Sequence, residues 1–217
     1  MSVRKLFERE LEDLKDQLVE MCRLTETMIS MAITALVNRD RELGFSIAEM
    51  DKKVDEYEMQ IEKQCMRILI KQQPVARDFR HVSTALKMIT DIERFGDQAS
   101  DIGELVYSMP GDKYIKKLNH TTEMGNLAIK MVRESVRSFI QSDIALADEV
   151  IALDDKMDEL FDTIKNELVE LIKKDSSNGD QAITLMMVAK YLERIGDHAV
   201  NVAEWTKYNE TGVHKKI

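Results

Sequence analysis

The sequence predicts an all-α protein built from two tandem, pseudo-symmetric three-helix bundles, and three observations support this prediction. Only 8 Gly and 2 Pro occur in 217 residues, too few turn formers for a fold of many short strands. The chain holds 14 Met, and Leu, Glu and Lys are frequent, all residues that favour helices. Apolar residues recur at steps of three and four positions along nearly the whole chain, which indicates one buried face per helix.

Three such apolar stripes lie in the first half of the chain. The first predicted helix covers 11–35 and stops at the polar run 38–41. The second covers 47–68 and ends before Pro74, because proline disfavours helical backbone at the residue before it. The third covers 82–106 and closes where Pro110 and Gly111 follow each other.

Three further stripes follow in the second half. They predict helices over 118–139, 146–171 and 185–206, separated by a short break at Ser142 and Asp143 and by a polar run at 174–180. At about 1.5 Å per residue, helices of this length reach ~40 Å. Short connections between long helices favour antiparallel packing of neighbours.

The two halves repeat each other. One group of residues returns 103 positions later: Asp51, Lys53, Asp55 and Glu56 match Asp154, Lys156, Asp158 and Glu159. Another returns 100 positions later: Glu93, Arg94, Gly96 and Asp97 match Glu193, Arg194, Gly196 and Asp197. We therefore expect two similar domains, 1–110 and 111–217.

Carboxylates occupy repeated positions on two helices of each half. Glu93, Asp97 and Asp101 are four residues apart and share one helix face, while Asp51 and Asp55 lie beside the apolar stripe of the preceding helix. The second half repeats the pattern at Asp154, Asp158, Glu193 and Asp197, with Asn201 in place of the third carboxylate. Like charges at this spacing destabilise a helix unless cations intervene. Carboxylate oxygens suit hard cations and can bridge two of them, so the pattern indicates a multinuclear metal site in each half.

A solvated acidic face would produce the same pattern, so this second interpretation stays open. Gly96 and Gly196 lie inside helices, where glycine costs ~1 kcal/mol relative to alanine. Each indicates either close approach of another backbone or room for an ion. Arg94 and Arg194 are expected to pair with the neighbouring acids, and His198 is interpreted as a partly exposed helix histidine. The sequence shows no phosphate-binding glycine loop, no Ser-His-Asp arrangement and no ExxH pair of a di-iron bundle.

Charge and cysteine usage exclude further classes. Forty acidic residues against 31 basic ones give a net charge of −9, which is unfavourable for binding nucleic acid or anionic lipid. The longest uncharged apolar stretch, 27–38, is too short to span a bilayer, so we expect no membrane insertion. The N-terminal residues lack a signal-peptide core, and Cys22 and Cys65 lack metal-site or disulfide spacing. These features predict a cytoplasmic protein.

The segments Asp91-Ile-Glu-Arg-Phe-Gly-Asp-Gln-Ala-Ser-Asp101 and Tyr191-Leu-Glu-Arg-Ile-Gly-Asp-His-Ala-Val-Asn201 resemble the duplicated signature of the PhoU phosphate-uptake regulators. The resemblance covers essentially the whole chain. It implies a PhoU-like fold with spectrin-repeat-like helix packing, and a cytoplasmic, non-enzymatic negative regulator of phosphate uptake and the phosphate-starvation response. It further implies three protein partners: the ATPase subunit of a phosphate ABC transporter, a phosphate-sensing histidine kinase, and a second copy in a homodimer.

The same resemblance implies multinuclear metal clusters, iron first among the metals, with zinc or nickel as alternatives. The first cluster would use Asp51, Asp55, Glu93, Asp97 and Asp101. The second would use Asp154, Asp158, Glu193 and Asp197 together with Asn201, which departs from the acidic pattern at the position that matches Asp101. Two other functions remain open from the residues alone: a metal-free helical adaptor, and a carboxylate-bridged metalloenzyme, for which no general base is evident beyond the ligands.

Overall fold

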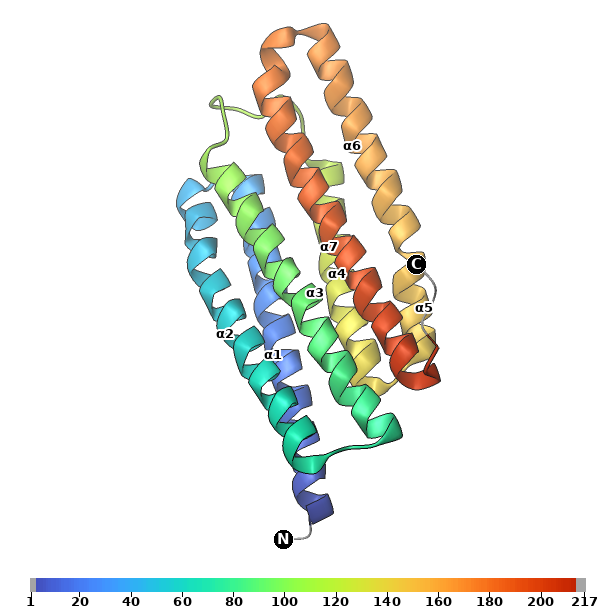
Figure 1. Cartoon of the computed structure of the whole chain (residues 1–217). Helices are drawn as coiled ribbons and strands as arrows, with labels where there is room; N and C mark the ends of the chain where they lie inside the picture. Colours follow the sequence, from blue (N-terminus) through green and yellow to red (C-terminus); the bar gives the residue numbers. More distant parts are fainter. Residues whose placement is uncertain (1–2, 214–217) are drawn as a thin grey trace.

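The computed structural model describes residues 3–213, and all regular structure within them is helical (Figure 1). The first half contains α1 (Val3–Asn38), α2 (Arg41–Gln72) and α3 (Ala76–Tyr107). The second half contains α4 (Asn119–Gln141), α5 (Ile144–Ala152), α6 (Asp154–Lys174) and α7 (Gly179–Thr211), with a 3₁₀ turn at Ser176–Asn178. The prediction of an all-α fold is confirmed. Across residues 3–213, no helix has the length and apolar composition that a bilayer-spanning segment requires.

Each half opens its second helix with the same device. The carboxylate of Asp40 accepts a hydrogen bond from the backbone amide of Leu43 at 3.0 Å, at the start of α2. The carboxylate of Asp143 does the same for Leu146 at 3.0 Å, at the start of α5. Such caps satisfy amides that have no partner inside the helix. Asp40 and Asp143 are 103 positions apart, so the repeat seen in the sequence is also a repeat of local structure.

The prediction of one continuous helix over 146–171 is wrong at a single residue, Leu153, which separates α5 from α6. The Leu153 amide donates to the carbonyls of both Glu149 and Val150, at 3.2 and 3.1 Å, so the backbone tightens there. Asp154 and Asp155 then begin α6, where negative side chains are favoured by the helix dipole. α5 and α6 therefore form one arm of the second bundle with a local break.

The two bundles share one apolar core. α1, α2 and α3 pack on one another, as do α4 to α7, and the halves meet where α3 contacts α7 and α1 contacts α4. Figure 1 shows α2 and α6 on the two flanks, with α3 and α7 between them. Buried side chains from both halves, including Phe95 and Phe139, form a single continuous cluster. The acidic residues of α3 and α7 consequently lie on helices that a common core holds in place.

Two glycines bring the backbones of α2 and α3 into contact. A Cβ atom added at Gly103 would lie 2.5 Å from the carbonyl oxygen of Gly44, and one added at Gly44 would lie 2.8 Å from the carbonyl oxygen of Gly103. Real Cβ atoms do not approach so closely, because a carbon and an oxygen overlap at that distance. This contact fixes the spacing of the two helices that carry the first set of acidic residues.

The connection between α3 and α4 is held by side chains from both halves. Gln181 of α7, which is buried, donates to the carbonyls of Pro110 and Lys113 at 2.8 and 3.0 Å. Its own oxygen accepts from the amide of Ile115 at 2.7 Å. From the first half, the Arg39 guanidinium donates to the carbonyl of Pro110 at 2.8 Å. The link between the halves is thus fixed to both of them.

Candidate functional site

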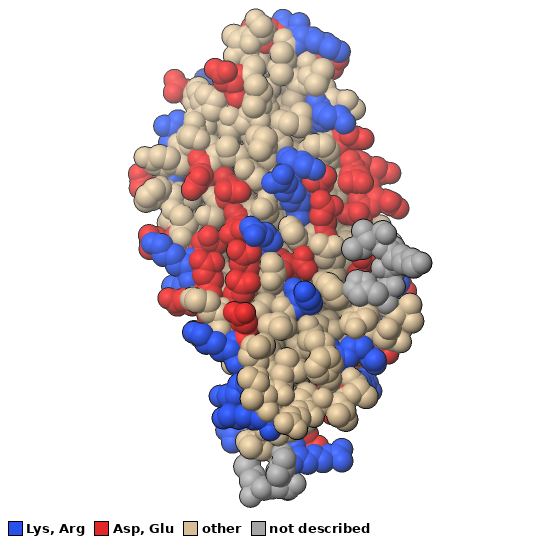
Figure 2. Space-filling model, viewed as in Figure 1, with Lys and Arg blue, Asp and Glu red and all other residues tan. Residues whose placement is uncertain are grey.

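The first acidic cluster comprises Asp51 and Asp55 of α2 together with Glu93, Asp97 and Asp101 of α3. Figure 2 shows acidic side chains gathered over these two helices. Gly96 lies among them on α3, and a Cβ there would come within 3.1 Å of Oδ1 of Asp51 and 3.2 Å of the Val54 side chain. The missing side chain at Gly96 therefore lets α2 approach and leaves room for the Asp51 carboxylate.

Burial and nearby negative charges raise the pKa of three carboxyl groups in the first cluster, those of Asp51, Glu93 and Asp101. Burial, followed by the charges of Asp97 and Asp55, raises the pKa of Asp51 to about 6. Burial, followed by the charge of Asp97, raises the pKa of Glu93 to about 7. Burial, with the charge of Glu104 next, also raises the pKa of Asp101. The charges that act on Asp51 are those of Asp97, Asp55 and Asp101, and its Oδ1 lies beside Gly96 of α3, so the structure brings the carboxylates of α2 and α3 near one another.

The first cluster is only partly neutralised by its neighbours. The Arg94 guanidinium pairs with Asp97 at 2.5 Å, as the sequence predicts. Its Nε also lies 3.4 Å from Oε2 of Glu93, which is buried and accepts no hydrogen bond. Oδ1 of Asp51 is likewise buried without a donor. Unsatisfied buried oxygens are costly, and a cation is one way to relieve that cost.

The second acidic cluster comprises Asp154 and Asp158 of α6 together with Glu193 and Asp197 of α7. Burial, followed by the charges of Asp158 and Asp197, raises the pKa of Asp154 to about 6, and its Oδ1 is buried without a hydrogen-bond partner. Burial, followed by the charge of Glu193, raises the pKa of Asp197. Both Glu193 oxygens accept from Nζ of Lys190, at 2.6 and 2.5 Å. This lysine partly neutralises the cluster from within the same helix.

The two helix glycines differ in their surroundings. Whereas Gly96 lies against a carboxylate, a Cβ at Gly196 would lie 3.1 Å from Cγ of Met157. Met157 matches Val54 in the repeat, so both glycines make room for an apolar side chain of the neighbouring helix, and only Gly96 also adjoins a carboxylate.

Asn201 turns away from the second cluster toward the first half. Its Nδ2 donates to Oδ1 of Asp91 at 3.1 Å, and Nδ1 of His198 lies 2.9 Å from the same oxygen. In the reciprocal position, the Tyr191 hydroxyl donates to Asp101. The third position of each motif thus makes a bond across the α3–α7 junction. The amide nitrogen of Asn201, a predicted member of the second metal site, is thus engaged by Asp91 of the first half.

Among the residues 3–213, no three His, Cys, Asp or Glu side chains are positioned as a ready-made set of ligands for one ion. The chemistry of the two acidic clusters nevertheless fits a hard cation, since Asp51, Glu93 and Asp154 each carry a buried carboxylate oxygen that accepts no hydrogen bond. Sequence reasoning missed two features of this region. The Lys190–Glu193 pair had a local signal, because residues three apart on a helix are neighbours. The Asp91–His198 contact had none, because it depends on how α3 and α7 are packed.

Comparisons with known proteins find the same domain in both halves of the chain. The model of the PhoU domain matches residues 18–106 and 121–206. The chain is 36% identical to the phosphate-specific transport system accessory protein PhoU homolog of Clostridium acetobutylicum, over 96% of each chain. It is 33% identical to the protein of the same name from Deinococcus radiodurans, over 97% of this chain and 99% of that one.

Solved structures show the same architecture. The crystal structure of PhoU from Pseudomonas aeruginosa superposes with a TM-score of 0.91 at 31% identity, over 95% of this chain and 100% of that one. The phosphate transport system regulatory protein PhoU from Streptococcus pneumoniae superposes with a TM-score of 0.90 over 97% of this chain and 100% of that one, and at 24% identity it speaks for the fold alone. With the domain model matched in each half and relatives aligned along nearly the whole chain, this protein belongs to the PhoU family.

Proposed function

We propose that this protein is an accessory component of a phosphate transport system and a negative regulator of phosphate uptake and the phosphate-starvation response. The main support is the full-length similarity to relatives named as accessory proteins of phosphate-specific transport, at 36% and 33% identity. In this proposal the protein acts by binding and not by catalysis. It works in the cytoplasm and couples the ATPase subunit of a phosphate ABC transporter to a phosphate-sensing histidine kinase.

We further propose that the two acidic clusters hold multinuclear metal, with iron as the first expectation and zinc or nickel as alternatives. The observation that supports this is the set of buried carboxylate oxygens without donors on Asp51, Glu93 and Asp154. Bound cations would supply the positive charge that these oxygens lack. The residues that would hold them are Asp51, Asp55, Glu93, Asp97 and Asp101 in one half, and Asp154, Asp158, Glu193 and Asp197 in the other.

One specific observation favours a second candidate, a helical adaptor that needs no metal. Arg94 already pairs with Asp97, and Lys190 engages both oxygens of Glu193. These two cations neutralise part of each cluster without any ion from solution. The adaptor and the metalloprotein share the same partners and differ only in what compensates the remaining carboxylates.

Deleting the gene tests the regulatory role. In the source organism growing in abundant phosphate, loss of the protein should switch on a reporter of the phosphate-starvation response, and a plasmid copy should switch it off again. A reporter that stays silent in the deletion strain would contradict the proposed function.

Elemental analysis tests the metal separately. Protein purified without chelator or a nickel column should contain more than one metal ion per chain. Metal-free protein that still restores repression would support the adaptor and leave the regulatory role intact. Light scattering in the micromolar range tests the expected homodimer, and a monomer at all concentrations would contradict it.

A further inference from the structure

The ammonium group of Lys190 lies inside the second acidic cluster. Its Nζ is 2.6 and 2.5 Å from the two carboxylate oxygens of Glu193, a side chain that is only 14% exposed. The same Nζ lies over the Phe161 ring of α6, 5.6 Å from the ring centre, where a cation is attracted to the face of an aromatic ring. α6 and α7 together therefore hold one positive charge against this carboxylate.

The first half has a different pair of residues at the equivalent positions. Thr90 matches Lys190 in the repeat of 100 residues, and Glu58 matches Phe161 in the repeat of 103 residues. The two pairs also correspond in the structure, because the Thr90 hydroxyl of α3 donates to Oε1 of Glu58 on α2 at 3.4 Å. The formal charge of the pair is −1 in the first half and +1 in the second. The surroundings of the second cluster are therefore less favourable for a metal ion.

The equivalent glutamates of the two clusters differ in the same sense. Oε2 of Glu93 is buried and accepts no hydrogen bond, although Nε of Arg94 lies 3.4 Å from it. Both oxygens of Glu193, in contrast, accept hydrogen bonds from Lys190. A metal ion can bind Glu93 at an oxygen that has no donor, whereas at Glu193 it meets two oxygens that an ammonium group already holds.

A metal ion on Glu193 and the ammonium group of Lys190 would repel each other. A bond between a metal and a carboxylate oxygen is about 2.0–2.2 Å long, so an ion on either oxygen would lie within about 5 Å of Nζ. Two positive charges at this separation repel strongly where water is partly excluded. The Lys190 side chain is 38% exposed, so its long stem can carry the ammonium group into solvent when an ion binds.

We propose that Lys190 sets the metal affinity of the second cluster, because metal binds there by displacing its ammonium group from Glu193. The second cluster consequently binds metal more weakly than the first and fills after it. Without metal, the ammonium group supplies one positive charge to the carboxylates in place of an ion. The proposal rests on the metal binding proposed above, and it assigns the difference between the two sites to one residue.

Full-length variants that retain a single cluster test the proposal. Asp97→Ala is expected to confine metal to the second cluster, and Asp197→Ala to the first. Metal-free samples are titrated with Zn²⁺, and with Fe²⁺ under nitrogen, in competition with a chromophoric chelator. We expect the first cluster to bind at least tenfold more tightly than the second. Lys190→Thr, which introduces the residue of the first half, should tighten binding at the second cluster at least tenfold. Thr90→Lys, at an exposed position, should weaken binding at the first cluster at least tenfold.

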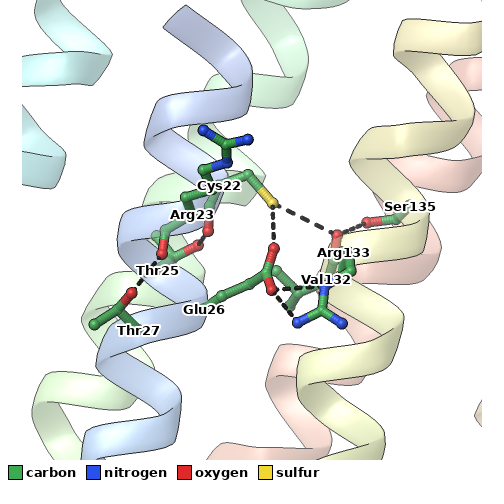
Figure 3. Close-up of polar contacts among 8 residues, drawn as sticks. All are labelled: Cys22, Arg23, Thr25, Glu26, Thr27, Val132, Arg133 and Ser135. Atoms are coloured by element: carbon green, nitrogen blue, oxygen red, sulfur yellow. Dashed lines mark hydrogen bonds and ion pairs between the residues drawn. The ribbon is translucent and has the colours of Figure 1, made fainter.

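Arg133→Gln provides a matched control for the loss of one positive charge. Arg133 donates from Nε and Nη2 to Oε2 of Glu26, at 2.8 and 2.6 Å (Figure 3). The Glu26 side chain is 16% exposed, close to the 14% of Glu193, so each variant takes a cation from a similarly buried glutamate. Arg133 and Glu26 belong to α4 and α1, which carry no residue of either acidic cluster. The control should bind metal within twofold of the protein without it.

The other outcomes overturn the proposal in distinguishable ways. If Lys190→Thr leaves the affinity of the second cluster unchanged or lowers it, Lys190 does not compete with metal. If Arg133→Gln tightens binding as much as Lys190→Thr, overall charge explains the effect. If Lys190→Thr fails to fold, Thr90→Lys decides, and an unchanged affinity at the first cluster then overturns the proposal. If the wild type binds neither ion, the proposed metal binding fails and this inference with it, while the gene deletion still tests the regulatory role.

Discussion

Replacing Gly103 by alanine should destabilise the protein through a backbone clash and not through a change at any functional group. The new Cβ would lie 2.5 Å from the carbonyl oxygen of Gly44, on the neighbouring helix. That oxygen belongs to a hydrogen-bonded helix backbone and cannot rotate away. α2 and α3 must therefore move apart, which disturbs the packing between them.

The size of the effect follows from two opposing contributions. Overpacking against a rigid neighbour costs up to about 3 kcal/mol. Alanine gains about 1 kcal/mol over glycine inside a helix. The expected net loss is about 2 kcal/mol, which lowers the melting temperature of a chain of this size by roughly 4 to 8 °C.

Two other glycines provide matched controls in a circular-dichroism melting series. A Cβ at Gly125 would lie just as close, at 2.5 Å, but to Cδ1 of the Ile33 side chain, which can change rotamer. A Cβ at Gly179 would have no atom within 4 Å. The expected loss is therefore largest for Gly103→Ala, smaller for Gly125→Ala, and absent for Gly179→Ala. A Gly103→Ala protein as stable as the wild type would refute the reasoning.

Three further predictions concern the metal, the pH dependence and the link between the halves. Asp97→Ala should remove the metal of the first cluster and leave the second largely loaded, and unchanged metal stoichiometry would refute this. Metal-free protein should become more stable as pH falls from about 8 to 5. The pKa values of Asp51 and Glu93 are raised to about 6 and 7 in the folded state, so the folded protein binds protons that the unfolded chain does not bind in this range. The added stability is lost as pH rises through those values. Melting at a series of pH values checks the sign. Gln181→Leu removes a hydrogen-bond partner from three backbone groups of the link and should lower the free energy of unfolding, measured in urea, by about 2 kcal/mol. An unchanged free energy of unfolding would contradict this role of Gln181.

The helices could be predicted from the sequence because each buries one face, and burial leaves a periodic apolar stripe. The break at Leu153 could not, since it arises from hydrogen bonds of the backbone that no side-chain pattern records. The gathering of Asp51 near Asp97 was predictable from repeated positions beside those stripes. The turn of Asn201 toward Asp91 was not, because it depends on the packing of two helices about a hundred residues apart in the chain.

The junction between the halves has the form of a symmetric dimer interface within one chain. Equivalent helices meet each other, α3 with α7 and α1 with α4, and position 91 faces 201 while 101 faces 191. Such reciprocal contacts define an isologous interface, in which identical subunits must present identical residues. Covalent linkage removes that requirement. Each copy of a contact can then change alone, as in the Asp101–Tyr191 and Asp91–Asn201 pairs, so one chain carries two related but unequal acidic faces.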